Sequence, residues 1–192
     1  MNGTIAASIL ALALPLGPVT AQETSDSRAI EEAVSALPEA MRGAAEVRLF
    51  KDGELATVRS GSNGLICLGD DPRDERWHVA CYHESLEPFM ARGRQLRAQG
   101  VTSRAAIDSI RGAEIESGKL AFPTGPTALY QLSGEMGSFN YETGEAEGAN
   151  ALYVLYLPYG TEASTGISTV PSQARPWLMA PGEPWAHVMI SR

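Results

Sequence analysis

Three stretches of the chain carry apolar residues at the spacing of an amphipathic helix. The first covers residues 30–41 and is interrupted at Pro38, because proline removes a backbone donor from a helix interior. The second covers residues 85–99, and the third begins at Thr102 or Ser103, either of which can cap a helix. The pattern therefore predicts two or three helices.

Shorter apolar runs bounded by turn residues are typical of β-strands. The strongest signal is Asp52-Gly53, a pair that favours a tight two-residue hairpin turn. The predicted strands cover residues 45–50, 55–59, 65–68, 128–132, 151–157 and 185–190, and residues 68–80 are predicted as a loop. Two helices between two groups of strands favour an α+β fold, with a mainly antiparallel sheet of about five or six strands and two or three helices.

The first 21 residues have the layout of a secretory signal peptide. They contain no acidic or basic side chain, are apolar from Ile5 to Leu16, and end in Val19-Thr20-Ala21, which fits a signal-peptidase site. Proline and glycine at positions 15, 17 and 18 stop the apolar run short of a membrane span and disfavour a buried helix. We therefore expect residues 1–21 to be removed, and residues 22–192 to form a single, soluble domain that is periplasmic or secreted.

The charge balance limits the classes of partner. The chain carries a formal net charge of −8, whereas contacts with nucleic acid or anionic lipid need clustered lysines and arginines. The one basic patch, Arg92, Arg94 and Arg97, is interpreted as a solvated helix face, with an anion-binding patch as the alternative. We therefore expect no nucleic acid partner and no membrane span after signal removal.

The two cysteines, Cys67 and Cys81, are predicted to form one disulfide, as an even cysteine count in an exported protein suggests. Closing a loop of about 15 residues would contribute ~3 kcal/mol on the chain-entropy model. The alternative is a zinc site that adds His78 and His83, but its spacing lacks the paired ligands of structural zinc sites. No cofactor or metal is expected.

Candidate chemistry centres on the three histidines, since these are the side chains that exchange protons near neutral pH. His83-Glu84 begins like the zinc-protease motif H-E-x-x-H, but the second histidine is replaced by Glu87. A metal-assisted hydrolase built from His83, Glu84 and His187 is the alternative hypothesis. His187 itself is interpreted first as a hydrogen-bonded core residue between large apolar neighbours.

The segment between the cysteines is a candidate interaction surface. It carries Trp77 and His78 among several charged residues, and a disulfide that orders it in advance would lower the entropy cost of binding. The alternative is a solvated connector whose tryptophan packs into the core. Trp77, His78, His83, Glu84 and His187 are therefore the candidate binding residues, and no catalytic residue is assigned.

Two segments resemble an exported bacterial protein family of unknown function. The first contains Gly61-Ser62-Asn63-Gly64, then Cys67-Leu68 and Asp70-Asp71-Pro72, and the second is Pro184-Trp185-Ala186-His187-Val188-Met189-Ile190. The resemblance implies export and a shared fold, and it implies no activity. Together with the absence of a recognisable catalytic motif, it favours a non-catalytic binding or interaction module of the cell envelope. Its partner is expected to be a small molecule or an envelope protein.

Overall fold

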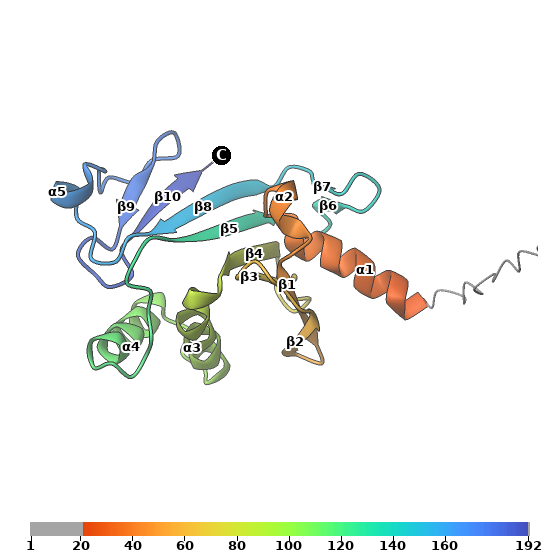
Figure 1. Cartoon of the computed structure of the whole chain (residues 1–192), viewed down its shortest axis with the longest axis horizontal. Helices are drawn as coiled ribbons and strands as arrows, with labels where there is room; N and C mark the ends of the chain where they lie inside the picture. Colours follow the sequence, from red (N-terminus) through yellow and green to blue (C-terminus); the bar gives the residue numbers. More distant parts are fainter. Residues whose placement is uncertain (1–20, 192) are drawn as a thin grey trace, which may run out of the picture.

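The computed structural model describes residues 21–191, and a mixed eight-stranded sheet organises them (Figure 1). Every pair of neighbouring strands is antiparallel except β1 and β3, which are parallel. In spatial order the strands are β2 (Glu54–Arg59), β1 (Glu46–Lys51), β3 (Leu65–Leu68), β4 (Trp77–His83), β5 (Thr127–Gly134), β8 (Asn150–Tyr156), β10 (His187–Ser191) and β9 (Trp177–Met179). The short strands β6 (Phe139–Asn140) and β7 (Glu145–Ala146) form a separate ribbon.

Helices cover the two faces of the sheet at different places. The helices are α1 (Ala21–Val34), α2 (Glu39–Arg42), the 3-10 turn η1 (Glu84–Leu86), α3 (Glu87–Ala98), α4 (Arg104–Glu116) and α5 (Glu162–Thr165). Helix α1 packs against β1, β3 and β4 on one face, whereas α3 and α4 lie beside each other below the opposite face (Figure 1). Within residues 21–191, none of the helices has the length and apolar character needed to cross a membrane.

Strand alternation divides the apolar side chains between two cores, because successive residues of a strand point to opposite faces. Val79 and Cys81 of β4 pack with Ala33 of α1 in the first core. Tyr82, the next residue of the same strand, packs with Phe89 of α3 in the second core. A central strand covered on both faces therefore holds the two cores together.

The local signals read from the sequence are confirmed. Asp52 and Gly53 both have positive φ, at 53° and 85°, as a two-residue hairpin turn requires. Helix α1 ends before Pro38 and α2 begins after it. Ser103 caps α4 by accepting a hydrogen bond from the backbone N–H of Ala106.

The α+β class is confirmed, but five or six strands and two or three helices are too few. The largest omission is β4, which begins at Trp77, within the last part of the segment predicted as a loop, and continues to His83. The sequence Trp-His-Val-Ala-Cys-Tyr-His shows no alternation of polar and apolar residues, because both faces of this strand are buried. Trp77 and His78 therefore belong to a central strand and not to a loop bounded by the cysteines.

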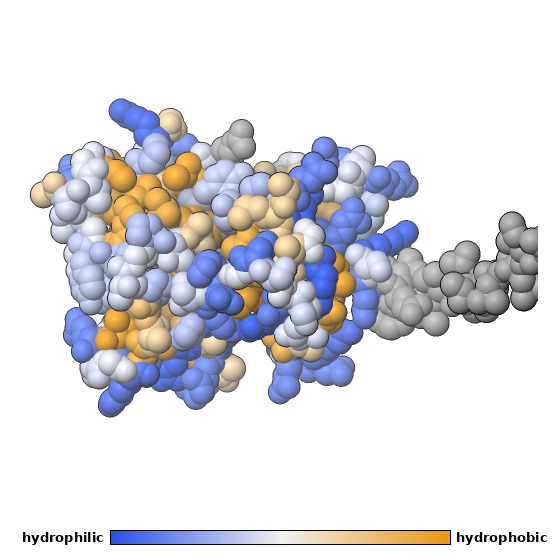
Figure 2. Space-filling view, viewed as in Figure 1, coloured by the Kyte–Doolittle hydropathy of each residue, from blue (hydrophilic) through white to orange (hydrophobic). Residues whose placement is uncertain are grey.

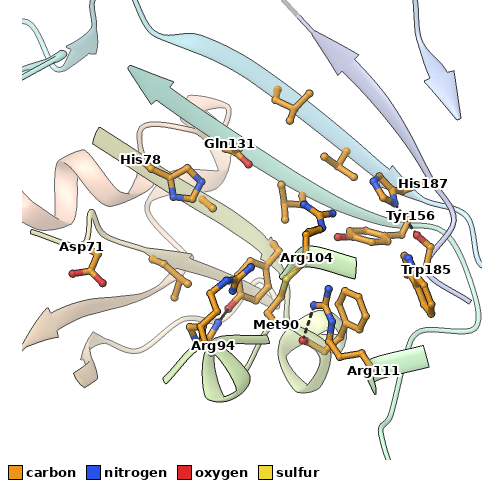
Figure 3. A pocket seen from close by; sticks show the side chains of 18 of the residues that line it. Asp71, His78, Met90, Arg94, Arg104, Arg111, Gln131, Tyr156, Trp185 and His187 are labelled. Carbon is orange, nitrogen blue, oxygen red and sulfur yellow. Dashed lines mark hydrogen bonds between the residues drawn. The ribbon is translucent and has the colours of Figure 1, made fainter. Parts of the chain in front are cut away.

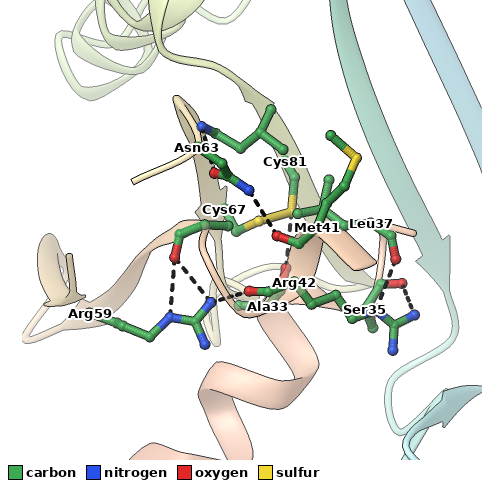
Figure 4. The surroundings of a disulfide bond; sticks show 11 residues. Ala33, Ser35, Leu37, Met41, Arg42, Arg59, Asn63, Cys67 and Cys81 are labelled. Atoms are coloured by element: carbon green, nitrogen blue, oxygen red, sulfur yellow. Dashed lines mark hydrogen bonds between the residues drawn. A yellow bond between two sulfur atoms is a disulfide. The ribbon is translucent and has the colours of Figure 1, made fainter. Parts of the chain in front are cut away.

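The disulfide between Cys67 and Cys81 is confirmed (Figure 4). The two residues lie directly opposite each other on β3 and β4, with Cα atoms 4.0 Å apart. The bond joins neighbouring strands of the first core, beneath α1. All of the predicted signal peptide except Ala21 lies outside the described residues.

Side chains tie the turn before β3 to the helical N-terminal segment (Figure 4). Asn63 donates from Nδ2 to the carbonyl of Met41 and accepts at Oδ1 from the N–H of Leu65. Arg59 donates to the carbonyls of Arg42 and Ala45. Asn63, in the Asn-Gly segment on which the family resemblance rests, thus has a structural role in this chain.

Candidate functional site

A cleft of about 620 Å³ lies between the sheet and the α3–α4 pair (Figure 3). Its volume falls within the range of about 300–1,000 Å³ that is usual for small-molecule sites. The sheet contributes alternate residues of β4, β5, β8 and β10, all pointing to the same face. The two helices contribute the opposite wall.

The floor of the cleft is mainly apolar. Leu129, Leu152, Val154 and Met189 come from three adjacent strands, and all but Val154 remain half-buried although they lie within the sheet. Figure 2 shows apolar surface over the end of the molecule that holds β8 and α4. Gln131 is the one amide side chain on the floor, and that side chain has no hydrogen-bond partner in residues 21–191.

Aromatic rings close the α4 end of the floor. Phe89 of α3 stacks on Trp185 with ring centroids 6.4 Å apart and meets Tyr156 edge to face at the same distance. Both contacts fall within the usual range for aromatic pairs. A ligand in the cleft would therefore meet apolar and aromatic side chains over much of its length.

Four arginines line the helical wall, Arg94 and Arg97 from α3 and Arg104 and Arg111 from α4. Figure 3 labels three of them, Arg94, Arg104 and Arg111. Arg94 bonds to Glu87, with Nη2 at 2.7 Å from Oε1. Arg104 and Arg111 share the carboxylate of Asp108, at 3.1 Å and 2.5 Å. Their positions follow from α3 and α4 packing side by side, which brings the inner faces of both helices to the same opening.

Two of these four positive charges have no carboxylate of their own. Glu87 is bound to Arg94 and also to Arg48, which has a second partner in Glu46. Asp108 balances one of the two arginines that it holds. Arg97 forms no ion pair with any residue that the structure describes. The helical wall of the cleft is therefore positive, although the chain as a whole is acidic.

Arg111 is the most deeply buried of the four, with 6% of its surface exposed. Its guanidinium lies 3.6 Å from the centroid of the Phe89 ring, and Nη1 donates to the Phe89 carbonyl. A Cβ on Gly93 would lie 3.0 Å from Nη1, so glycine leaves the room that the guanidinium occupies. Burial lowers the pKa of Arg111 from its usual value. Its Nε is buried without a hydrogen-bond partner among the described residues, an arrangement that costs about 1–3 kcal/mol.

Tyr156 and His187 form the other polar group at this end, with ring centroids 5.2 Å apart. Nδ1 of His187 lies 2.7 Å from the carbonyl oxygen of Trp185, so Nδ1 carries the proton and donates it. Burial, and then the positive charge of Arg104, lower the pKa of His187. Burial raises the pKa of Tyr156 to about 12. Both side chains are therefore neutral near pH 7, and Nε2 of His187 is a hydrogen-bond acceptor.

The structure brings together only two of the five candidate binding residues, His78 and His187, in this cleft. Trp77 is 2% exposed on the opposite face of the sheet, where Nε1 donates to Glu32 at 2.5 Å. His83 and Glu84 are exposed beyond the cleft, and Nδ1 of His83 lies 2.9 Å from the Ser85 hydroxyl.

His78 and His187 lie at different ends of the cleft. On β5, His78 is paired with Ser133, whereas His187 is level with Thr127 through Tyr156. Six residues of strand separate the two levels, which corresponds to about 20 Å. The structure also leaves His83 and Glu84 apart from His187, and residues 21–191 contain no group of three or more His, Cys, Asp or Glu side chains able to hold a metal. The three residues of the hydrolase alternative are thus not assembled into a metal site.

Arg104 and Arg111 are the residues of the cleft that the sequence reasoning missed. Arg94 and Arg97 line the cleft with them, although Arg97 is exposed as a solvated helix face predicts, and an anion-binding role for this patch stays a prediction. A signal was present, since five of the chain's 15 lysines and arginines lie between residues 92 and 111, with Asp108 as the one acidic residue in that window. Such a density of arginine in an acidic chain indicates a local positive surface.

Comparisons with models of protein families, with curated protein sequences and with solved structures found no match to this chain.

Proposed function

We propose that this protein is an exported, non-catalytic binding module of the cell envelope that holds a small anionic molecule with an apolar body. The observation that carries the proposal is the helical wall of the cleft, where four arginines share two carboxylates above an apolar floor. The other carboxylates that line the cleft, Asp71 and Asp74, come from the segment before β4 and not from this wall, and Asp71 is paired with Arg73. Low-dielectric walls strengthen the field of such charges and concentrate anions at the opening.

The same features argue for a small ligand and against a polyanion. Nucleic acids need a long row of phosphate contacts, whereas the four arginines here lie at one cleft of a chain with net charge −8. The cleft volume of about 620 Å³ suits a molecule of metabolite or drug size.

Export is supported indirectly. The Cys67–Cys81 disulfide is of the kind that persists in oxidising compartments and is rare in the cytosol. The predicted signal peptide and the resemblance to an exported family point the same way, and both stay predictions.

The test compares two fluorescent probes that differ in charge. The anion 8-anilinonaphthalene-1-sulfonate carries a sulfonate on an aromatic body, and N-phenyl-1-naphthylamine has the same body without the sulfonate. Fluorescence titration of the mature protein is expected to give clearly tighter binding of the anionic probe, with an affinity that falls as salt is added.

Variants locate the site. Arg97→Ala and Arg104→Ala are each expected to weaken binding of the anionic probe by about tenfold or more, since a hydrogen bond to a charged group contributes about 1.5–3 kcal/mol. Arg28→Ala is the matched control, because this exposed arginine lies on α1, on the other side of the sheet. Circular dichroism establishes that each variant is folded. Equal affinity for the two probes, or an equal loss in the Arg28 variant, would refute the proposal.

A further inference from the structure

We infer that the Tyr156–His187 end of the cleft recognises a carboxylic acid whose α-carbon carries a hydrogen-bond donor, either a hydroxyl or an acylated amine. His187 accepts that hydrogen bond, and the arginines of α4 bind the carboxylate. The inference rests on the proposed function and names the ligand class of the same cleft.

The charge at this end suits a monoanion. Arg104 and Arg111 share the single carboxylate of Asp108, which leaves one positive charge unbalanced. The Tyr156 hydroxyl has no hydrogen-bond partner in residues 21–191, and the charges of both arginines act on it. A planar carboxylate can accept from a guanidinium and from this hydroxyl together.

His187 adds a requirement that a bare carboxylate does not meet. Nδ1 donates to the Trp185 carbonyl, so the lone pair of Nε2 is left for the cleft. A carboxylate oxygen placed against that lone pair would be repelled, because both are acceptors. A ligand that satisfies this end therefore presents a donor to His187 and an anionic oxygen to the arginines.

The His187 acceptor and the α4 arginines are close enough for one end of a ligand to contact both. The Tyr156 and His187 rings are 5.2 Å apart, and His187 interacts electrostatically with both Arg104 and Asp108. A donor on the α-carbon keeps within a few bonds of the carboxylate and so fits this spacing. The remainder of the molecule would extend over Val154 and Leu129 towards Gln131.

The first experiment needs no variant. Isothermal titration calorimetry of the mature protein compares 3-phenyllactate and N-acetylphenylalanine with 3-phenylpropionate, which has the same carboxylate and ring but no donor. At least one of the two donor-bearing acids is expected to bind about threefold to tenfold more tightly than 3-phenylpropionate, the effect of one net hydrogen bond. Whichever of the two binds better distinguishes a hydroxy acid from an acylated amino acid.

The second experiment assigns the acceptor. His187→Phe is expected to remove the preference for the donor-bearing acid, whereas His83→Phe, at an exposed histidine outside the cleft, should retain it. If the His187 variant is unfolded by circular dichroism, long-range ¹H–¹⁵N spectra of the unmodified protein replace it. They should show Nε2 of His187 unprotonated, with a ¹⁵N shift that moves when the donor-bearing acid binds.

The outcomes separate this inference from the proposed function. Equal binding of all three acids, no detectable binding of any acid while the anionic probe binds, or a preference that survives in the His187 variant would each overturn the inference and leave the proposed function standing. An unmoved Nε2 signal would also overturn it. Failure of both the acids and the anionic probe to bind would overturn the proposed function itself.

Discussion

Gly112 allows α4 to pack closely against the indole of Trp185, and Gly112→Ala tests that packing. Gly112 is buried in α4, and a Cβ at this position would lie 2.7 Å from both Cη2 and Cζ3 of the Trp185 indole. Ordinary carbon contacts need about 3.5–4 Å. The ring would therefore have to move by about 1 Å away from α4, and the cleft is the open side that it borders.

Two effects of opposite sign decide the stability of this variant. Alanine favours a helix interior over glycine by about 1 kcal/mol. Overpacking a well-fitted site costs about 1–3 kcal/mol, and the indole is also held by its stack on Phe89. We therefore expect a net loss of about 1 kcal/mol in the free energy of unfolding, together with weaker binding of the anionic probe.

Urea unfolding followed by circular dichroism measures the first effect, and probe titration measures the second. Gly43→Ala is the matched control, because Gly43 has an ordinary helical φ of −65° and nothing within 4 Å of its Cβ position. The control should be neutral or stabilised by about 0.4–1 kcal/mol. A Gly112 variant as stable as the control, with unchanged probe affinity, would show that the indole does not limit the helix and would refute the reasoning.

Three further predictions follow from single features of the fold. Thiol titration of the denatured, unreduced protein should find no free thiol at Cys67 or Cys81, and two reactive thiols would contradict this expectation. Replacing both cysteines by alanine should lower the free energy of unfolding by ~3 kcal/mol. Folding lowers the pKa of His187, so the unfolded chain binds the proton first as pH falls, and the free energy of unfolding should drop below about pH 6.5. His187→Phe should reduce this dependence on pH in urea titrations, and an unchanged dependence would contradict the assignment to His187. Gln131→Leu should keep or raise the free energy of unfolding, by up to about 1 kcal/mol, because the side-chain amide of Gln131 makes no hydrogen bond to a described residue; a marked loss would mean that the amide is structural.

The parts of the fold that could be predicted are those determined by neighbouring residues. The Asp52-Gly53 turn, the break at Pro38 and the Ser103 cap depend on backbone preferences that a few residues express. Strand β4 could not be found in this way, because burial on both faces removes the alternation that marks a strand. Its burial is set by α1 on one face and α3 on the other, and both are tertiary contacts.

The candidate site was harder to predict for the same reason. The sequence pattern places His187 between large apolar neighbours and His78 in a charged segment, but it does not show that they share a cleft with the arginines. Arg94 has the pattern of a solvated helix face, and only the packing of α3 against the sheet turns it towards the floor. Trp77 of the cysteine-bounded segment packs into the core beneath α1, as the alternative interpretation of that segment predicts.

Several features that weaken this fold lie at the cleft, although one buried hydroxyl without a partner among the described residues, that of Ser35, lies elsewhere. An open apolar floor loses burial worth about 25 cal/mol per Å². Arg111 is buried with an N–H that lacks a partner in the described chain, and His187 is kept neutral with one acceptor unfilled. Conflicts of this kind are expected where a protein binds something, since a ligand that meets the unfilled groups stabilises the folded state by mass action. The contacts that the empty cleft leaves unmade lower the free energy of unfolding. The same contacts, once an anionic, apolar ligand makes them, supply its binding free energy.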